Sequence, residues 1–139
     1  MTDTHPPSAA HERTGRCECG GVSYRTSAPM RDVFNCHCGR CRRFTGHHMA
    51  GTAVDAAALE LMSSSTLSWY EPAPGVEYGF CRRCGSSLFW RTSGRPGRVT
   101  ICAGTLDQPT GLRTAQAWWV AEAGDYHERP SVTEFEYDG

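Results

Sequence analysis

The segment that decides the fold of this chain is residues 36–41, which read Cys-His-Cys-Gly-Arg-Cys. Three thiols lie within these six residues, and two further groups flank them, Cys-Glu-Cys at 17–19 and Cys-Arg-Arg-Cys at 81–84. Such short spacings let the backbone turn so that neighbouring sulfur atoms point at one zinc ion about 2.3 Å away. Seven of the eight cysteines therefore predict zinc binding.

Glycine follows two of these groups directly, as Gly20 after the first and Gly85 after the third. Glycine supplies the left-handed backbone conformation that a turn of this kind tends to need. The eighth cysteine, Cys102, stands alone in a candidate strand. A single cysteine in a strand is most simply a small core residue.

The spacing leaves open which groups share an ion. A structural zinc has four protein ligands, whereas a catalytic zinc has three and an open position. The pairs at 17–19 and 81–84 would close one four-sulfur site and leave the trio at 36–41 as an open site. The pair at 38–41 together with the pair at 81–84 would also make a four-cysteine site.

Composition limits the classes of function. The chain has 139 residues, the size of one domain, with 14 basic and 15 acidic residues and a net charge of −1. This charge gives no general attraction to nucleic acid or to anionic lipid. No stretch approaches the roughly 18 apolar residues of a membrane span, and the N-terminus lacks the apolar part of a signal peptide. We expect a cytoplasmic chain without membrane association, in which clustered cysteines are metal ligands rather than disulfides.

Residues 1–14 contain Pro, Ser and His and little to bury, so they predict a disordered tail. Residues 15–139 predict a single domain. Its 15 Gly and 8 Pro, with turn signals roughly every 8–12 residues, indicate an all-β fold.

Short apolar or alternating runs mark the candidate strands. They are Val22–Thr26, His48–Val54, Leu59–Met62, Thr66–Tyr70, Leu88–Arg91, Val99–Cys102 and Trp118–Val120. The serine turn at 63–65 suggests that the third and fourth runs form a pair, and the turn at 93–97 predicts a hairpin. The best helical signal, Asp55–Leu59, allows at most two turns.

Four motifs follow one another along the chain. Gly15–Tyr24 reads G-x-C-x-C-G-x-V-x-Y, and Cys36–Gly46 reads C-H-C-x-x-C-R-x-x-x-G. Gly79–Leu88 reads G-F-C-x-x-C-G-x-x-L, and Ala103–Pro109 reads A-G-T-L-D-x-P. In this order they resemble the motifs of the glutathione-dependent formaldehyde-activating enzymes, a family that shares its domain with centromere protein V.

The resemblance implies a β-tent fold, in which small antiparallel sheets are pinned by zinc, and two Zn²⁺ ions per chain. The implied ligands of a structural zinc are Cys17, Cys19, Cys81 and Cys84. The implied ligands of an active, more exchangeable zinc, and hence the catalytic residues, are Cys36, Cys38 and Cys41. The implied activity is that of a carbon–sulfur lyase that joins glutathione to formaldehyde and gives S-hydroxymethylglutathione, or that acts on a related thiol and aldehyde.

Other residues are candidates for the substrate. Guanidinium groups pair bidentately with carboxylates, so the arginines next to the trio are expected to bind glutathione. These are Arg40, Arg42 and Arg43. His37 is a candidate fourth ligand or proton carrier, as are His47 and His48, for which an ordinary loop or strand position is the simpler interpretation. The chain departs from the family pattern at Tyr78, where Arg is common, and at Gln116-Ala117, where His is common.

A different class of function also fits the cysteines. Both zinc ions would be structural in a non-catalytic binding module for protein or nucleic acid, and basic zinc knuckles do bind nucleic acid. The net charge of −1 and the absence of Lys argue against nucleic acid, whose binding depends on many basic contacts. The sequence leaves the oligomeric state open.

Overall fold

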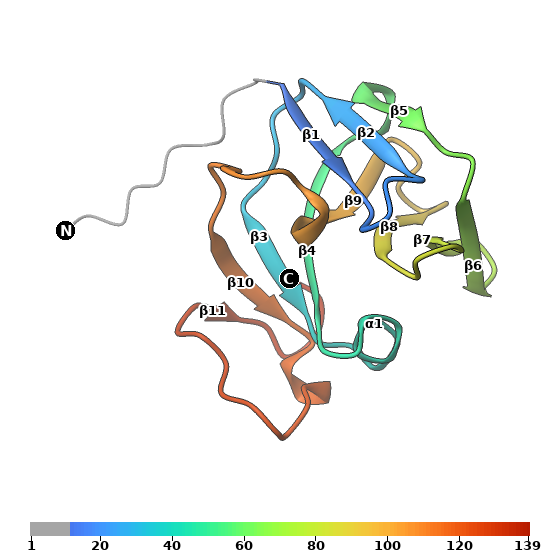
Figure 1. The fold of residues 1–139 in the computed structure, drawn as a ribbon. Helices are drawn as coiled ribbons and strands as arrows, with labels where there is room; N and C mark the ends of the chain where they lie inside the picture. The colour runs from blue at the N-terminus through green and yellow to red at the C-terminus, as the bar shows by residue number, and fades with distance from the viewer. Residues whose placement is uncertain (1–11) are drawn as a thin grey trace.

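Two β-sheets make up the fold of residues 12–139, which are the residues that the computed structural model describes (Figure 1). The smaller sheet contains β1 (Arg13–Arg16), β2 (Ser23–Thr26) and β5 (Leu59–Ser63) in the order β1-β2-β5, and all its pairs are antiparallel. The larger sheet contains β3 (Val33–Cys36), β4 (Met49–Asp55), β6 (Leu67–Ala73), β7 (Val76–Cys81), β8 (Ser87–Thr92), β9 (Arg98–Cys102), β10 (Thr114–Trp118) and β11 (Thr133–Glu134). Its order is β11-β10-β3-β4-β9-β8-β7-β6.

Helical elements are short. The one α-helix is α1 (Gly39–Thr45) among the described residues, and the 3₁₀ turns are η1 (Ala56–Ala58), η2 (Ala103–Thr105) and η3 (Val120–Glu122). The β-rich fold class is thus confirmed, with one difference. The strand β10 pairs in parallel with both β3 and β11, so the larger sheet is mixed. The chain leaves β9, crosses through residues 103–113 and runs beside β3 in the same direction.

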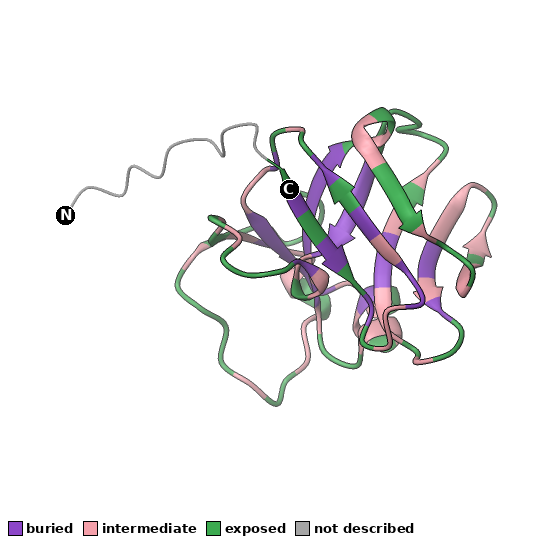
Figure 2. Cartoon of the chain, turned by 45° about the horizontal axis from the view of Figure 1, so that its top comes forward, coloured by how far each residue is buried: buried purple, intermediate pink, exposed green. Residues whose placement is uncertain are grey.

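The core has two clusters, and each contains one cysteine group. The first surrounds Cys17 and Cys81 with Tyr24, Leu88 and Phe89, all at most 1% exposed. The second joins the following residues: Phe34, Cys36, Cys41, Met49, Tyr78 and Cys102. Figure 2 shows that buried positions concentrate on the central strands of the larger sheet, whereas the C-terminal connections are mostly half-buried or exposed.

One glycine sets the packing of the second cluster. A Cβ atom on Gly51 of β4 would lie 2.7 Å from the ring of Phe34 and 2.9 Å from the side chain of Thr100. Gly51 therefore lets the Phe34 ring lie flat against β4. The indole of Trp118 stacks on that ring, with the two centroids 4.0 Å apart.

The expected strands are present, but two local predictions were wrong. Runs 59–62 and 66–70 do form strands, yet β5 pairs with β2 in the smaller sheet and β6 pairs with β7 in the larger one. The hydroxyl of Ser63 donates to the Gly21 carbonyl oxygen, which holds β5 on its own sheet. The last predicted strand, 118–120, ends at Trp118, because Trp119 adopts a left-handed conformation with φ of 58°.

The hairpin predicted around residues 93–97 is confirmed by the antiparallel pairing of β8 and β9. The helical signal at 55–59 is only the single 3₁₀ turn η1.

The N-terminal strand begins before the expected domain start at residue 15. Arg13 and Thr14, assigned to a disordered tail from composition, pair with Thr26 and Arg25 of β2. Arg13 is buried, and its Nε donates to the carbonyl oxygen of Thr110 at 3.0 Å. The rest of the expected tail, residues 1–11, lies outside the described part of the chain. No helix in that described part is long and apolar enough to cross a membrane.

Candidate active site and metal centres

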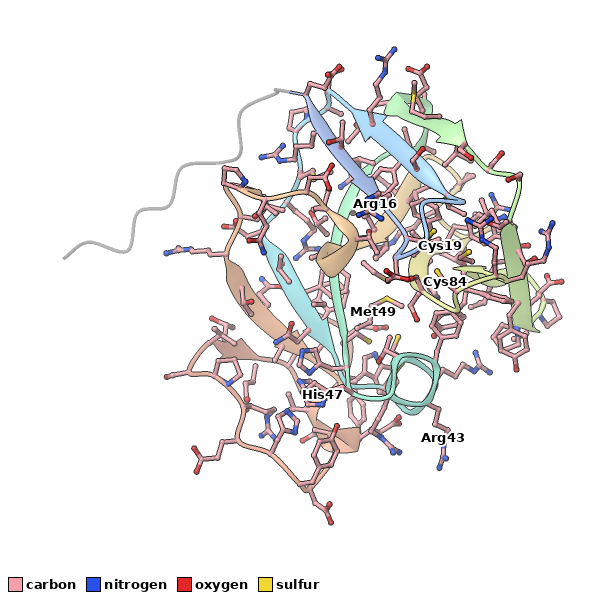
Figure 3. All side chains as sticks on the ribbon, viewed as in Figure 1. Arg16, Cys19, Arg43, His47, Met49 and Cys84 are labelled. Atoms are coloured by element: carbon pink, nitrogen blue, oxygen red, sulfur yellow. The ribbon has the colours of Figure 1, made fainter. Side chains whose placement is uncertain are left out.

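Four cysteines meet where two turns face each other. Cys17 and Cys19 come from the turn between β1 and β2, and Cys81 and Cys84 from the turn between β7 and β8. All four sulfur atoms lie within 4.8 Å of one another, with 3.7 Å between Cys17 and Cys19 and 3.6 Å between Cys19 and Cys81. A tetrahedral zinc with bonds of about 2.3 Å sets sulfur–sulfur separations of about 3.8 Å, so the group fits zinc. Figure 3 shows Cys19 and Cys84 approaching from the two turns.

N–H groups of the chain point at these sulfur atoms. The backbone N–H of Val22 donates to Cys17 Sγ at 3.2 Å, and that of Gly21 to Cys19 Sγ at 3.4 Å. The Nε of Arg83 also donates to Cys19 Sγ at 3.2 Å. Hydrogen bonds to the charged form favour thiolates, which are the form that binds metal.

Glycines shape both turns as predicted. Gly20 has φ of 81° and Gly85 has φ of 82°, and both values lie in the left-handed region. The N–H of Gly85 donates to the Cys81 carbonyl oxygen at 2.7 Å, which closes the turn.

Two hydroxyl groups favour the thiolate form of cysteines in this group. The Ser86 hydroxyl lies 3.2 Å from Cys84 Sγ and lowers the pKa of that thiol to about 5. The Thr66 hydroxyl, 3.2 Å from Cys81 Sγ, lowers the pKa of Cys81 to about 7. Burial raises the pKa of Cys17. At neutral pH the group carries negative charge, as a cation site requires.

The other three grouped cysteines lie at the junction of β3 and α1. Cys36 ends β3, Cys38 is the N-cap residue of α1, and Cys41 lies in the first turn of α1. The Cys38 sulfur accepts a hydrogen bond from the Cys41 N–H at 3.4 Å, and Gly46 ends the helix with φ of 84°. Their sulfur atoms also lie within 4.8 Å of one another. The helix, which the sequence analysis did not predict, thus turns the three thiols toward one point.

The contacts among the three thiols change their pKa values in opposite directions. Hydrogen bonds from the Cys36 thiol, and then from Cys41, lower the pKa of Cys38 to about 2. The contact with Cys38 raises the pKa of Cys36. The Tyr78 hydroxyl lies 3.3 Å from Cys41 Sγ, and burial raises the pKa of Tyr78, so it stays protonated and is able to donate to that sulfur.

Within the described residues, no further Cys, His, Asp or Glu joins these three sulfur atoms. His37, a candidate fourth ligand from sequence, instead places its ring nitrogens with those of His48 and His127. The ring of His47 is exposed and hydrogen-bonds the Tyr126 hydroxyl. The three-cysteine group could therefore offer three sulfur ligands to a metal ion, and the four-cysteine group could offer four.

The three-cysteine group opens onto a cleft of about 680 Å³. This volume falls in the range of about 300–1,000 Å³ that is usual for small-molecule sites. Aromatic rings form much of its wall: Phe34, Tyr78, Trp90, Trp118 and Trp119. Five arginines also line it: Arg31, Arg40, Arg43, Arg95 and Arg98. Glu122 and Asp138 are its acidic residues.

Of the three arginines that were proposed from sequence, only two line the cleft. Arg40 and Arg43 line it, and Figure 3 shows Arg43 projecting from α1, but Arg42 on the same helix does not line it. Three lining arginines were not proposed from sequence: Arg31, Arg95 and Arg98. No local signal identifies them.

Of the two departures from the family pattern, Tyr78 lines this cleft and Gln116 contacts two residues that line it. Tyr78 contacts Cys41, as described above. The Gln116 side-chain oxygen accepts hydrogen bonds from Arg31 at 3.1 Å and from the Trp118 indole at 2.8 Å. The Arg31 guanidinium lies 5.0 Å from the ring centroids of Phe34 and Trp118. Gln116 therefore holds both the Arg31 guanidinium and the Trp118 indole in position beside the cleft.

None of the eight cysteines, all of which lie in the described residues, forms a disulfide. Cys102 is buried in the second core cluster, and burial raises the pKa of its thiol to about 12. It is the core residue that its isolated position predicts.

Comparisons with known proteins agree with this geometry. A crystal structure of a Rhodobacter sphaeroides protein superposes with a TM-score of 0.57, covering 73% of this chain and 99% of that one at 21% identity, which supports the fold. No curated protein matches the chain. The family model described as glutathione-dependent formaldehyde-activating enzyme matches residues 12–122, well over half of the chain. The protein therefore belongs to the family of glutathione-dependent formaldehyde-activating enzymes.

Proposed function

We propose that this protein is a zinc-dependent carbon–sulfur lyase of the cytoplasm that forms S-hydroxymethylglutathione from glutathione and formaldehyde, or acts on a related thiol and aldehyde. One observation carries the proposal. Three thiols that lack a fourth ligand among the described residues face a cleft that arginines surround. Family membership supports the same type of reaction.

The proposal gives the two cysteine groups different roles and assigns one Zn²⁺ to each. Cys17, Cys19, Cys81 and Cys84 hold a structural ion, since four ligands complete a tetrahedral site. Cys36, Cys38 and Cys41 hold the active ion. When bound there, zinc supplies Lewis acidity and lowers the pKa of a substrate thiol.

Charge supports glutathione as the thiol. Glutathione carries two carboxylates and one ammonium group, and the cleft has more arginine than acidic side chains. Arg40 and Arg43 lie on the same helix as two of the thiols and are exposed, so they can pair with carboxylates. Glu122 offers a carboxylate for the ammonium group.

In the proposed reaction the substrate sulfur forms a bond to the aldehyde carbon. The π electron pair of the carbonyl moves to its oxygen, and the proton lost by the thiol ends there, so no oxidant or reductant is needed. The indole rings of Trp90 and Trp118 give the cleft an apolar lining. Tyr78 positions Cys41 through its hydroxyl and keeps its own proton.

The alternative of a nucleic-acid-binding module gains little from the arginines beside the four-cysteine group. Arg83 donates to Cys19, and Arg82 donates to the Ser65 carbonyl oxygen at 2.7 Å. Side chains engaged with their own chain are poorly placed for phosphate contacts.

The test is exchange NMR of glutathione and formaldehyde, because the uncatalysed addition is itself rapid and must be measured beside the catalysed one. We expect the zinc-loaded protein to accelerate the interconversion of glutathione and its adduct, and Cys38→Ser to return the rate to that of buffer. A rate equal to that of buffer with matched zinc would refute the proposed activity.

A further inference from the structure

Three histidine side chains from distant parts of the chain meet beside the end of β3. His37 follows β3, His48 precedes β4, and His127 lies in the connection between η3 and β11. One nitrogen from each ring lies within 4.8 Å of the corresponding nitrogens of the other two. The ring centroids are 5.0 Å apart for His37 and His48, 5.9 Å for His37 and His127, and 6.0 Å for His48 and His127. The three rings thus surround one point.

Five of the six nitrogens of these rings are buried without partners among the described residues. His37 is only 1% exposed, and neither of its ring nitrogens has a hydrogen-bond partner among the described residues. The same is true of both ring nitrogens of His127 and of Nδ1 of His48. Buried polar atoms normally have partners, since each has given up its hydrogen bond to water. Five such atoms in one place need a partner that the neighbouring side chains do not supply.

The spacing matches coordination of one ion. Zinc–imidazole bonds are about 2.0–2.1 Å long, and tetrahedral geometry then puts the ring centres about 5 Å apart. The observed range of 5.0–6.0 Å is close to this value. Small rotations of the side chains are enough to bring three nitrogens to bonding distance.

The donor set selects the class of ion. The carboxylate of Glu134 lies near His37 but pairs with Arg129, at 2.7 and 3.3 Å. The remaining donors are imidazoles, which favour zinc, nickel and copper, whereas magnesium and calcium need oxygen.

We propose that His37, His48 and His127 form a third metal site, which binds one divalent transition-metal ion of the zinc class through three imidazole nitrogens. The site is distinct from both cysteine groups and does not depend on the proposed reaction. His47 lies at its edge, with its ring 4.2 Å from that of His48 and 4.4 Å from that of His127 (Figure 3). No nitrogen of its ring joins the three ligand atoms that lie within 4.8 Å of one another, so His47 is not one of the three ligands.

The site has a structural consequence. His37 stands between Cys36 and Cys38, so a metal on His37 restrains the segment that carries two thiols of the three-cysteine group. The same ion ties the connection that contains His127 to the end of β3.

The experiment uses the full chain without a histidine tag, dialysed against a weak chelator and titrated with Co²⁺ at pH 7.5. The difference spectrum between wild type and His127→Ala should show visible cobalt bands without the near-ultraviolet band of sulfur ligands. We expect the affinity of this ion to fall at least about 100-fold in His127→Ala, because a direct ligand matters more than an outer partner, whose loss costs about 10- to 100-fold. His5 and His11 are present in all the proteins and cancel in the difference.

The matched control is His47→Ala, which removes a neighbouring exposed imidazole and should keep the affinity within about threefold. His48→Gln is the second ligand variant and should reproduce the loss seen in His127→Ala, with an unchanged far-ultraviolet circular dichroism spectrum. Equal cobalt binding by wild type and His127→Ala would overturn the site. So would a loss in His47→Ala as large as that in His127→Ala, or a sulfur band in the difference spectrum.

Discussion

The four-cysteine and three-cysteine groups consist of the same side chain, but their cysteines come from different numbers of chain segments. The four-cysteine group joins two turns that lie more than sixty residues apart in sequence, and its four sulfur atoms lie close enough together to bind one ion. The three-cysteine group comes from residues 36–41 alone and opens onto the cleft. A site whose ligands come from two distant segments holds the fold together, whereas a site whose ligands come from one segment adds little to it.

The surroundings of the two groups follow the same division. Backbone N–H groups and Arg83 supply most of the donors to the four-cysteine group. The three-cysteine group has fewer such donors, the Cys41 N–H and the Tyr78 hydroxyl, and lies in a region lined by aromatic rings and arginines. Fixed donors suit a permanent ion, and an open wall suits exchange with a substrate.

The largest expected effect is a difference in how much each cysteine group contributes to the thermal stability of the protein. Cys81→Ser should lower the melting temperature by more than about 10 °C or abolish cooperative unfolding. Apparent binding energies of structural zinc, about 10–16 kcal/mol, rival the whole stability of a domain. Cys38→Ser should shift the melting temperature by less than about 5 °C, because no distant segments depend on it. Thermal unfolding followed by circular dichroism measures both.

Elemental analysis of zinc is the companion measurement. Cys38→Ser should retain the zinc of the four-cysteine group after mild dialysis with a weak chelator. Equal losses of thermal stability in the two variants would contradict the division into a structural and a reactive site.

The contrast also explains which features the sequence could predict. The ligand spacings and the left-handed glycines Gly20 and Gly85 are local properties, and the structure has both. The pairing of run 59–62 with run 66–70 was wrong, because a serine turn looks the same whether its flanking strands pair or enter two sheets. The helix at 39–45 was missed, since its N-cap is a thiol rather than Ser, Thr, Asp or Asn.

Residues that converge from distant segments had no sequence signal. His127 lies in an irregular connection, and its partners are visible only when that connection packs against the end of β3. Arg31 and Arg98 reach the cleft from separate strands or loops, whereas Arg42 lies beside the motif but on another face of α1. Proximity in sequence was therefore a poor guide to the wall of the cleft, although it was a good guide to the thiols.

Two variants that each delete one hydroxyl group test whether the two cysteine groups bind metal independently. Tyr78→Phe removes the hydroxyl 3.3 Å from Cys41, and Thr66→Val removes the one 3.2 Å from Cys81. Outer partners of metal ligands are typically worth about 10- to 100-fold in affinity. Each variant should weaken metal binding by that factor at its own group alone, measured by cobalt titration against a competing chelator. A variant that weakened both groups would show that they are coupled.

Two arginines on α1 test which side chains contribute to glutathione binding. Arg43→Ala should raise the KM for glutathione by up to about fivefold, as expected for an exposed ion pair worth up to about 1 kcal/mol. Arg42→Ala is the control, because it removes the same charge from α1 without lining the cleft. Steady-state kinetics over a range of glutathione concentrations gives both values. A KM that rises equally in both variants would mean that only the net charge of α1 matters.

The smallest expected effect is a pH dependence on the side of the three-cysteine group. Burial lowers the pKa of His48 to about 4, from an ordinary value of 6.5. Between these values the unfolded chain binds a proton that the folded chain does not. The contribution of His48 to the free energy of unfolding is therefore fully present above about pH 6.5 and is lost as the pH falls toward 4.

Urea unfolding at pH 7.5 and 5.5, after mild dialysis with a weak chelator, measures this contribution. The midpoint should fall further in wild type than in His48→Gln, whose amide does not titrate. Protonation of the zinc-binding thiolates also destabilises the protein at low pH, but it acts on both proteins alike and cancels in the difference. The difference should be modest because His48 is only half-buried. Parallel midpoints in the two proteins would show that the folded chain accommodates a charged imidazole at this position.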